Sequence, residues 1–146
     1  MNAPERHVRI PADLERLGEL RALVREVGAA GGASRNDIDD LVQAVDEAAA
    51  NTVVHGYAGR PGWIDATLRI VDGTLIVTLE DEAPTFDPTA APEPDMDVPA
   101  LVRGPGGMGI HLMRLATDTL DYRPRTGGGN VLTLTRSLAH RPKEDG

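Results

Sequence analysis

Hydrophobic residues recur at helical spacing in the first part of the chain, and this pattern predicts two amphipathic helices. The first is expected to begin after Asp13, which serves as its N-cap, and to end at Gly31–Gly32. The second is expected to begin after Ser34, with Asp37 three residues later as an acidic form of the capping box, and to end at Gly56. Both segments therefore have a start signal, an apolar stripe and a glycine stop.

Farther along, apolar and polar residues alternate with period two, which is typical of strands that bury one face. Asp72–Gly73 separates two such runs and signals a two-residue hairpin, and a second hairpin is expected to turn through Thr126–Gly129. A third helix is expected at residues 108–118. The predicted strands are residues 7–12, 63–70, 74–81, 119–125 and 131–138. This order of elements predicts a mixed α/β (α+β) fold.

Composition and charge narrow the class of protein. The chain has 146 residues and no cysteine, so we expect one domain (1–146) without disulfides or thiolate metal sites, with residues 140–146 frayed. The formal net charge of −8 argues against a nucleic-acid binder, which needs a basic face. No apolar run approaches the ~20 residues of a membrane-spanning helix, and the charged N-terminus does not fit a signal peptide. The sequence therefore predicts a soluble, cytoplasmic protein that binds neither nucleic acid nor membrane.

Polar residues on the back of the second predicted helix are the first candidates for chemistry. Glu47, Asn51 and His55 follow one another at i, i+4 and i+8, and the first two lie opposite the apolar stripe. Ala50 and Val54 surround them where a surface helix would carry charges, so we expect another element to cover this face. A carboxylate one turn from a carboxamide suits a hard cation and a reacting phosphate. The alternative is a pair of solvated polar residues.

Asp81 is the second candidate because it continues the apolar face of its predicted strand. Leu75, Val77 and Leu79 share one side at period two, and Asp81 is the next residue on that side. A buried carboxylate is costly unless it is hydrogen-bonded, and the exocyclic amine of a bound base would satisfy it. The alternative is that the strand has already ended and the acid caps a turn.

A glycine-rich run, Gly104-Pro-Gly-Gly-Met-Gly109, leads directly into the third predicted helix. Glycine N–H groups approach an anion closely and a helix N-terminus adds partial positive charge, which favours a phosphate-facing turn. The run also fits the fingerprint of NAD-type dinucleotide-binding domains, but that fingerprint needs a preceding strand and a parallel βαβ unit. Here a loop at 84–107, rich in proline and acids, precedes the helix, and loops of this length are usually functional or mobile.

These segments, in this order, resemble the GHKL ATPases. EAAANTVVHGY is similar to the asparagine-bearing box of that family, in the form found in the RsbW/SpoIIAB anti-sigma factors, which are serine-protein kinases. DEAPTFDP stands in the place of the adenine-side box, GPGGMGIHLM in that of the lid-hinge glycine box, and NVLTLTR resembles the closing strand. The resemblance covers roughly residues 7–137. It implies a two-layer Bergerat-type sandwich, a mixed, mostly antiparallel sheet with helices on one face and an ATP lid at about 84–107.

The same resemblance implies roles for individual residues. Asn51 would be the Mg²⁺ ligand, Glu47 the base or orienting group for the attacking hydroxyl, and Asp81 the acceptor for adenine N6. Further nucleotide contacts are expected from His55, Ala83, Phe86, Arg103, Gly106, Gly107, Met108, Gly109, Ile110 and Thr133. Arg103 or Arg114 is a candidate to meet the phosphates, or an ordinary surface cation, and a histidine near a helix C-terminus can instead cap carbonyls. The family's adenine-side box usually has two glycines where this chain has Ala83 and Thr85, which predicts a tighter wall beside the base.

The resemblance implies an ATP-dependent kinase that phosphorylates an anti-anti-sigma (antagonist) protein and sequesters a sigma factor, with a homodimer expected. A histidine kinase needs a dimerising helix pair that presents the acceptor, and 146 residues leave no room for one. The alternative is a non-catalytic ATP-binding switch that captures its partner without phosphorylating it. The acid at Glu47 favours catalysis because a pure binder would not need it.

Overall fold

The computed structural model describes residues 3–90 and 106–138, which form helices and strands in alternating groups. In chain order they are β1 (Ala3–Pro11), η1 (Leu14–Arg16), α1 (Leu17–Ala30), α2 (Arg35–Asn51), η2 (Thr52–Gly56), β2 (Trp63–Val71), β3 (Thr74–Asp81), η3 (Pro88–Ala90), α4 (Gly106–Ala116), β4 (Thr119–Pro124) and β5 (Asn130–Ser137). Every helix and strand predicted from the sequence is present. The third helix begins two residues earlier than expected, so that Gly106 and Gly107 belong to its first turn.

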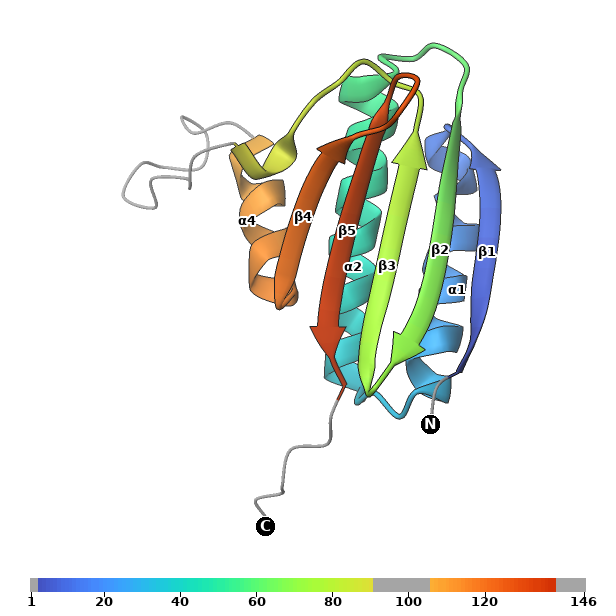
Figure 1. The fold of residues 1–146 in the computed structure, drawn as a ribbon, viewed down its shortest axis with the longest axis vertical. Helices are drawn as coiled ribbons and strands as arrows, with labels where there is room; N and C mark the ends of the chain where they lie inside the picture. Colours follow the sequence, from blue (N-terminus) through green and yellow to red (C-terminus); the bar gives the residue numbers. More distant parts are fainter. Residues whose placement is uncertain (1–2, 91–105, 139–146) are drawn as a thin grey trace.

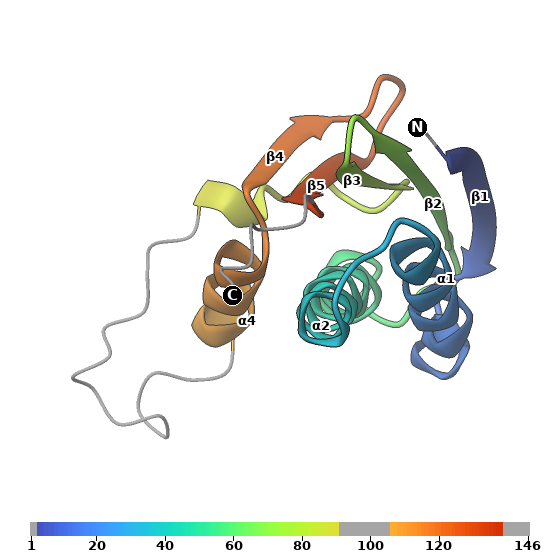
Figure 2. The same cartoon turned by 90° about the horizontal axis from the view of Figure 1, so that it is seen from below.

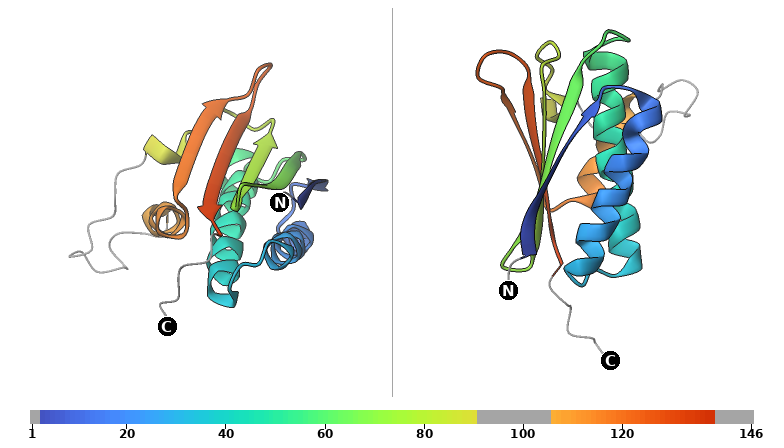
Figure 3. Two further views of the ribbon diagram at one scale, coloured as in Figure 1. Left: turned by 60° about the horizontal axis from the view of Figure 1, so that its bottom comes forward. Right: turned by 90° about the vertical axis from the view of Figure 1, so that its right-hand side faces the viewer.

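The five strands form one sheet in the order β1-β2-β3-β5-β4, and each pairing among the described residues is antiparallel (Figure 1). Helices α1, α2 and α4 cover one face of this sheet, which gives the two-layer arrangement seen in Figures 2 and 3. The predicted α+β sandwich is therefore confirmed. Strand β5 lies between β3 and β4, so the chain that leaves β3 passes through α4 and β4 before it returns beside β3.

Local signals in the sequence explain the ends of the elements. Ser34 Oγ accepts the Asp37 N–H at 3.1 Å and caps α2 as predicted. The Asp37 carboxylate does not complete the capping box; it accepts from Arg136 Nη2 at 2.5 Å instead. Arg136 also donates to the Ala116 carbonyl at 2.7 Å, so this one side chain joins the start of α2 and the end of α4 to β5. A tertiary ion pair has taken the place of a local contact.

The first hairpin has the turn that its sequence predicts. Asp72 and Gly73 both have positive φ, 51° and 76°, and Val71 pairs with Thr74 across them. This register places Leu75, Val77 and Leu79 on the buried side of β3. Asp81 continues that side as the last residue of the strand, so the alternative of a strand that ends before Asp81 is wrong.

The second long helix changes geometry at its end. Its α-helical part stops at Asn51, and residues Thr52–Gly56 form a single π-helical turn in which Tyr57 N–H donates to the Thr52 carbonyl at 2.8 Å. Such turns are rare and occur frequently at functional sites. Within the described ranges, no helix is long and apolar enough to cross a membrane. The expectations for residues 91–105 and 139–146, which include most of the proposed lid and the frayed C-terminus, lie outside the described residues.

Candidate functional site

A cavity lies between the helices and the sheet, beside the C-terminal end of β3. The empty space in and around it, open solvent at its mouth included, is about 480 Å³. The helices contribute the stripe Ala48, Asn51, Thr52 and Gly56, together with Met113 of α4. The sheet and the chain after β3 contribute Leu79, Asp81, Ala83, Phe86, Pro88, Tyr122, Asn130 and Leu132. Apolar side chains therefore form most of the wall, and a few polar groups converge in it, as in small-molecule sites.

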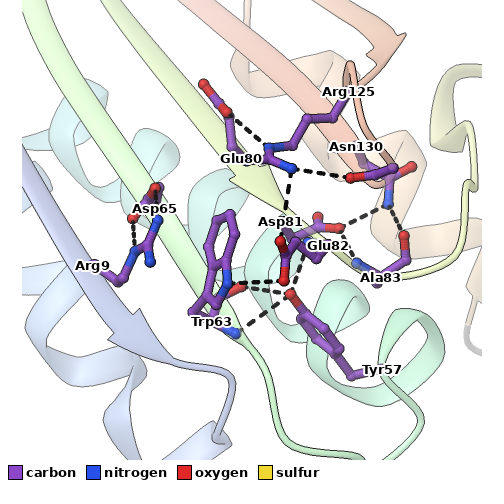
Figure 4. A network of polar contacts seen from close by, with 11 residues as sticks. Arg9, Tyr57, Trp63, Asp65, Glu80, Asp81, Glu82, Ala83, Arg125 and Asn130 are labelled. Carbon is purple, nitrogen blue, oxygen red and sulfur yellow. Dashed lines mark hydrogen bonds and ion pairs between the residues drawn. The ribbon is translucent and has the colours of Figure 1, made fainter.

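Asp81 is the central polar group of this cavity. Its side chain is only 5% exposed, and its Oδ1 accepts the Ala83 N–H at 2.9 Å and the Asn130 amide at 2.8 Å (Figure 4). Burial raises the pKa of Asp81, and the hydrogen bonds from Asn130, Ala83 and Thr52 oppose that increase. The bonds from Ala83 and Asn130 both use Oδ1, and Asp81 as a whole lines the cavity.

Asn130, the first residue of β5, pairs with Asp81 across the sheet and is 9% exposed. Its amide nitrogen also lies 3.3 Å from the Ala83 carbonyl and 3.2 Å from that of Pro84. Its oxygen accepts the Phe86 N–H at 2.9 Å and the Tyr122 hydroxyl at 2.7 Å. Sequence reasoning missed this residue. Its signal was a polar residue at the start of an apolar strand after three glycines, but the strand register that places it beside Asp81 is not readable from the sequence.

Tyr57 supports the same segment from the other side. Its hydroxyl accepts the Glu82 N–H and donates to the Trp63 carbonyl, each at 2.8 Å (Figure 4). The ring is 5% exposed, and burial raises the pKa of this hydroxyl. Tyr57 and Asn130 together form hydrogen bonds to three consecutive residues, Asp81, Glu82 and Ala83. These bonds fix the floor of the cavity.

Glu47 and Asn51 lie one turn apart on α2, and Glu47 is not among the residues that line the cavity. Asn51 lines the cavity directly, and both side chains are half-buried. The element that covers Glu47 is α4: a Cβ atom at Gly109 would lie 2.0 Å from Glu47 Oε2. The backbone of α4 can approach this carboxylate only because residue 109 is glycine. The sequence predicted that another element covers this face of the helix. α4 covers it at Glu47, but the face is open at Val54, which is 46% exposed.

Ala83 and Phe86 both line the cavity as expected, Ala83 buried and Phe86 51% exposed at the rim. Among the described residues, Ala58 and Asp72 are the only non-glycine residues with positive φ. Ala83 and Thr85 therefore occupy the positions of the family's glycines without a left-handed backbone. The Ala83 methyl packs toward Gly56, where an added Cβ would lie 3.0 Å away. The wall is close-fitting at this point.

Three predicted nucleotide contacts do not lie in the cavity. His55 is exposed, because the stripe of the helix that faces the cavity runs through Ala48, Thr52 and Gly56. Ile110 is 4% exposed within the hydrophobic core. Thr133 lies between the inward-facing Leu132 and Leu134 of β5, so it faces the side of the sheet away from the helices. The strand period therefore contradicts the assignment of Thr133 as a nucleotide contact.

The glycine-rich run is described only in part. Gly106, Gly107 and Met108 form the first turn of α4, and Gly109 follows. Arg103 lies outside the described residues. Arg114 donates from Nη2 to the Thr89 carbonyl at 2.6 Å, which ties α4 to the short η3 turn. No three His, Cys, Asp or Glu side chains within 3–90 and 106–138 gather as a metal site.

Comparison with known proteins agrees with this geometry. A family model described as the histidine kinase-like ATPase domain matches residues 10–136, almost the whole described chain. A curated relative, the serine/threonine-protein kinase BtrW of Bordetella bronchiseptica, is 36% identical over 100 residues, which are 68% of this chain and 70% of that one.

Two further similarities cover more of the chain. The serine-protein kinase RsbW of Bacillus licheniformis is 28% identical over 143 residues, 93% of this chain and 87% of its own. The crystal structure of the RsbU and RsbW domains of Rv1364c from Mycobacterium tuberculosis superposes with a TM-score of 0.65 at 24% identity. That match covers 96% of this chain and 34% of the other, so the chain spans about a third of that larger protein.

Proposed function

Because this chain belongs to the histidine kinase-like ATPase domain family, we propose that it is an ATP-dependent serine-protein kinase of the RsbW type. In this proposal it phosphorylates an anti-anti-sigma antagonist protein and sequesters a sigma factor. The observation that carries the proposal is the buried Asp81 at the base of a largely apolar cavity, with Asn51 of α2 in the same wall. The names of the relatives, which are serine-protein kinases, support the reaction.

Asp81 is suited to read adenine. Its Oδ1 accepts from Ala83 and Asn130, and we expect its second oxygen to accept the N–H of the exocyclic amine. Guanine carries a carbonyl oxygen at that ring position, which would meet the carboxylate as a second acceptor. The site should therefore prefer adenine nucleotides, since an unmatched buried acceptor costs the desolvation of that group.

Glu47 and Asn51 are suited to the phosphate end. Their oxygen atoms are the hard donors that Mg²⁺ uses, and this ion is commonly held by one or two side chains together with substrate phosphates. Asn51 would hold it, and the ion would supply neutralisation of phosphate charge. Glu47 would then orient the serine hydroxyl of the partner protein or accept its proton. The remaining contribution is positioning of the hydroxyl in line with the γ-phosphate.

Two other functions differ from this proposal in what they predict. A non-catalytic switch would bind ATP and partner but transfer no phosphate. A dinucleotide-binding domain would bind NAD(H), but the described strands pair only antiparallel, so the parallel βαβ unit of that fold is not among them. The fold therefore argues against the dinucleotide reading.

The direct test is incubation with radiolabelled ATP, Mg²⁺ and an antagonist protein that carries the acceptor serine. We expect label on the antagonist, and none on a serine-to-alanine version of it. Titration with Mg-ATP and with NADH distinguishes the proposed kinase from a dinucleotide-binding domain, which would bind NADH. Tight binding of ATP and sigma factor without transfer would favour the switch. The same proposal includes a homodimer and a cytoplasmic location. Light scattering of the purified protein measures its mass and so tests the homodimer.

A further inference from the structure

We propose that Asn130 is a positioning residue that couples recognition of the base to the conformation of the chain at the rim of the cavity. The inference rests on the proposed function, because the base is the adenine of ATP. The observation behind it is that one buried carboxamide bonds both Asp81, which reads the base, and Phe86, which lines the mouth of the cavity.

The orientation of the Asn130 amide is determined by its partners. Its nitrogen faces three acceptors, the Asp81 carboxylate and the carbonyls of Ala83 and Pro84, at 2.8–3.3 Å. Its oxygen faces two donors, the Phe86 N–H and the Tyr122 hydroxyl. A flipped amide would place its oxygen against three acceptors and its NH₂ against the Phe86 N–H, and only the Tyr122 hydroxyl could turn to suit it. The group is thus fully bonded in a single orientation.

The position of Asn130 is as tightly constrained as its orientation. Gly129 has φ of 118°, and a Cβ atom there would lie 1.9 Å from the Asp81 carbonyl oxygen. Strand β5 therefore begins in close contact with the end of β3, which brings the Asn130 amide to the Asp81 carboxylate. Tyr122 of β4 holds the same amide from the next strand.

This geometry creates a physical link between two parts of the site. A base that bonds to the second oxygen of Asp81 fixes that carboxylate, and the Asn130 amide then has less freedom to shift. The amide in turn holds the backbone at Pro84 and Phe86, the first residues of the chain that leaves the sheet toward α4. Base binding should therefore stabilise the rim, and a rim that is displaced should weaken base binding by the same factor, because the coupling of two equilibria is reciprocal.

The test compares the parent with Asn130→Asp and Asn130→Ser, using Thr78→Val on the outer face of β3 as the matched control. Asn130→Asp keeps the shape but sets an acceptor and a negative charge against Asp81. Asn130→Ser removes the bridge with a small polar residue, in case the charged variant does not fold. Affinity is measured for ATP and for its analogue without the 6-amino group.

We expect the parent to prefer ATP over the analogue by roughly 10- to 100-fold, and both Asn130 variants to lose most of this preference. A purely structural role would weaken both ligands equally and leave the preference intact. Hydrogen exchange at the Phe86 amide supplies the second readout: we expect ATP to slow it in the parent and in Thr78→Val, but not in the Asn130 variants.

Two results would overturn the inference while the proposed function stands: an unchanged ATP preference in folded Asn130 variants, or ATP-dependent protection of Phe86 that survives them. If the parent itself does not bind ATP, the proposed function fails, and this coupling fails with it. The thermal unfolding of each variant identifies those that are folded before either readout is taken.

Discussion

The two ends of the cavity are built in different ways. At the end proposed to bind the adenine base, here called the base end, Asp81 and Asn130 are paired across β3 and β5 and are at most 9% exposed. They form hydrogen bonds to each other and to the adjacent backbone. On the helical side, Asn51 of α2 lines the cavity and Glu47 lies one turn earlier on the same helix, outside the lining. Both are half-buried, and the cover over Glu47 is the backbone of α4 at Gly109. Strand pairing fixes the first end, whereas packing between two helices fixes the second.

In the proposed function, this difference would separate recognition of the base from transfer of the phosphate. Paired strands hold their backbones in register whether or not a ligand is present, so the base end can be formed before ATP binds. The contact between the helices is more sensitive, because a methyl group added at Gly109 would overlap the Glu47 side chain, which must then shift. We therefore expect changes at Asp81 to alter affinity for the base, and changes on the helical side to alter how the phosphates are bound or transferred. Four substitutions test this expectation.

The largest effect is expected for Glu47→Gln. Glutamine keeps the volume but cannot accept the hydroxyl proton, so phosphate transfer to the antagonist should fall ~10²–10⁴-fold with ATP affinity nearly unchanged. The matched control is Asp46→Asn. Asp46 directly precedes Glu47 on the helix, but its carboxylate pairs with Arg21 of α1 at 2.6 Å and does not line the cavity. Transfer at the parental rate in Glu47→Gln, measured with radiolabelled ATP, would show that this acid is structural.

Asp81→Asn should reduce ATP affinity by ~1.5–3 kcal/mol with no separate effect on the transfer step. The Ala83 N–H and the Asn130 amide will keep the new carbonyl oxygen at the Oδ1 position, so the new NH₂ group faces the base amine. Calorimetric titration with ATP checks this. Equal affinity in variant and parent would place the base elsewhere.

The same substitution should make the protein more stable at neutral pH. Burial raises the pKa of Asp81 in the folded state, so the folded protein binds this proton more tightly than the unfolded chain does. Ionised Asp81 is therefore a cost at pH values above its folded pKa, and that cost shrinks as the pH falls through this pKa and is gone below the pKa of the unfolded chain. Urea unfolding should show an advantage for Asp81→Asn at pH 7 that shrinks on acidification; an advantage independent of pH would contradict this account.

Gly109→Ala should lower both stability and ATP affinity, by ~1–3 kcal/mol in stability, because the new methyl overlaps Glu47 Oε2. Gly18→Ala in α1 is the control: its Cβ would meet no atom nearer than Arg21 Nη2 at 3.5 Å, so it should be neutral or slightly stabilising. Adding Glu47→Ala to Gly109→Ala should restore stability but not transfer. If Gly109→Ala is as harmless as Gly18→Ala in urea unfolding, the close approach of Gly109 to Glu47 does not contribute to stability.

The smallest effect is expected for Asn51→Ala. Loss of one neutral oxygen ligand should reduce ATP affinity by ~1 kcal/mol, and only when Mg²⁺ is present. Titration with and without Mg²⁺ separates the two contributions. A loss of equal size without Mg²⁺ would assign Asn51 to the nucleotide itself rather than to the ion.

Much of the fold could be predicted because its signals are local. The N-cap at Ser34, the Asp72–Gly73 turn and the period-two face that ends at Asp81 each depend on neighbours within a few residues. The helix face that carries Glu47 and Asn51 could be read in the same way. Local geometry is enough for such features, since the period of a helix or strand fixes which residues share a side.

The sequence by itself therefore determined the elements, the candidate acids and the family. Only the tertiary structure decided that Asn130 belongs to the site and Thr133 does not, that Gly109 rests on Glu47, and that Asp37 pairs with Arg136. These facts depend on the register of β5 against β3 and on the contact of α4 with α2. Both join residues far apart in the chain, and a shift of one residue in register would exchange the two faces of β5, so no local pattern could determine them.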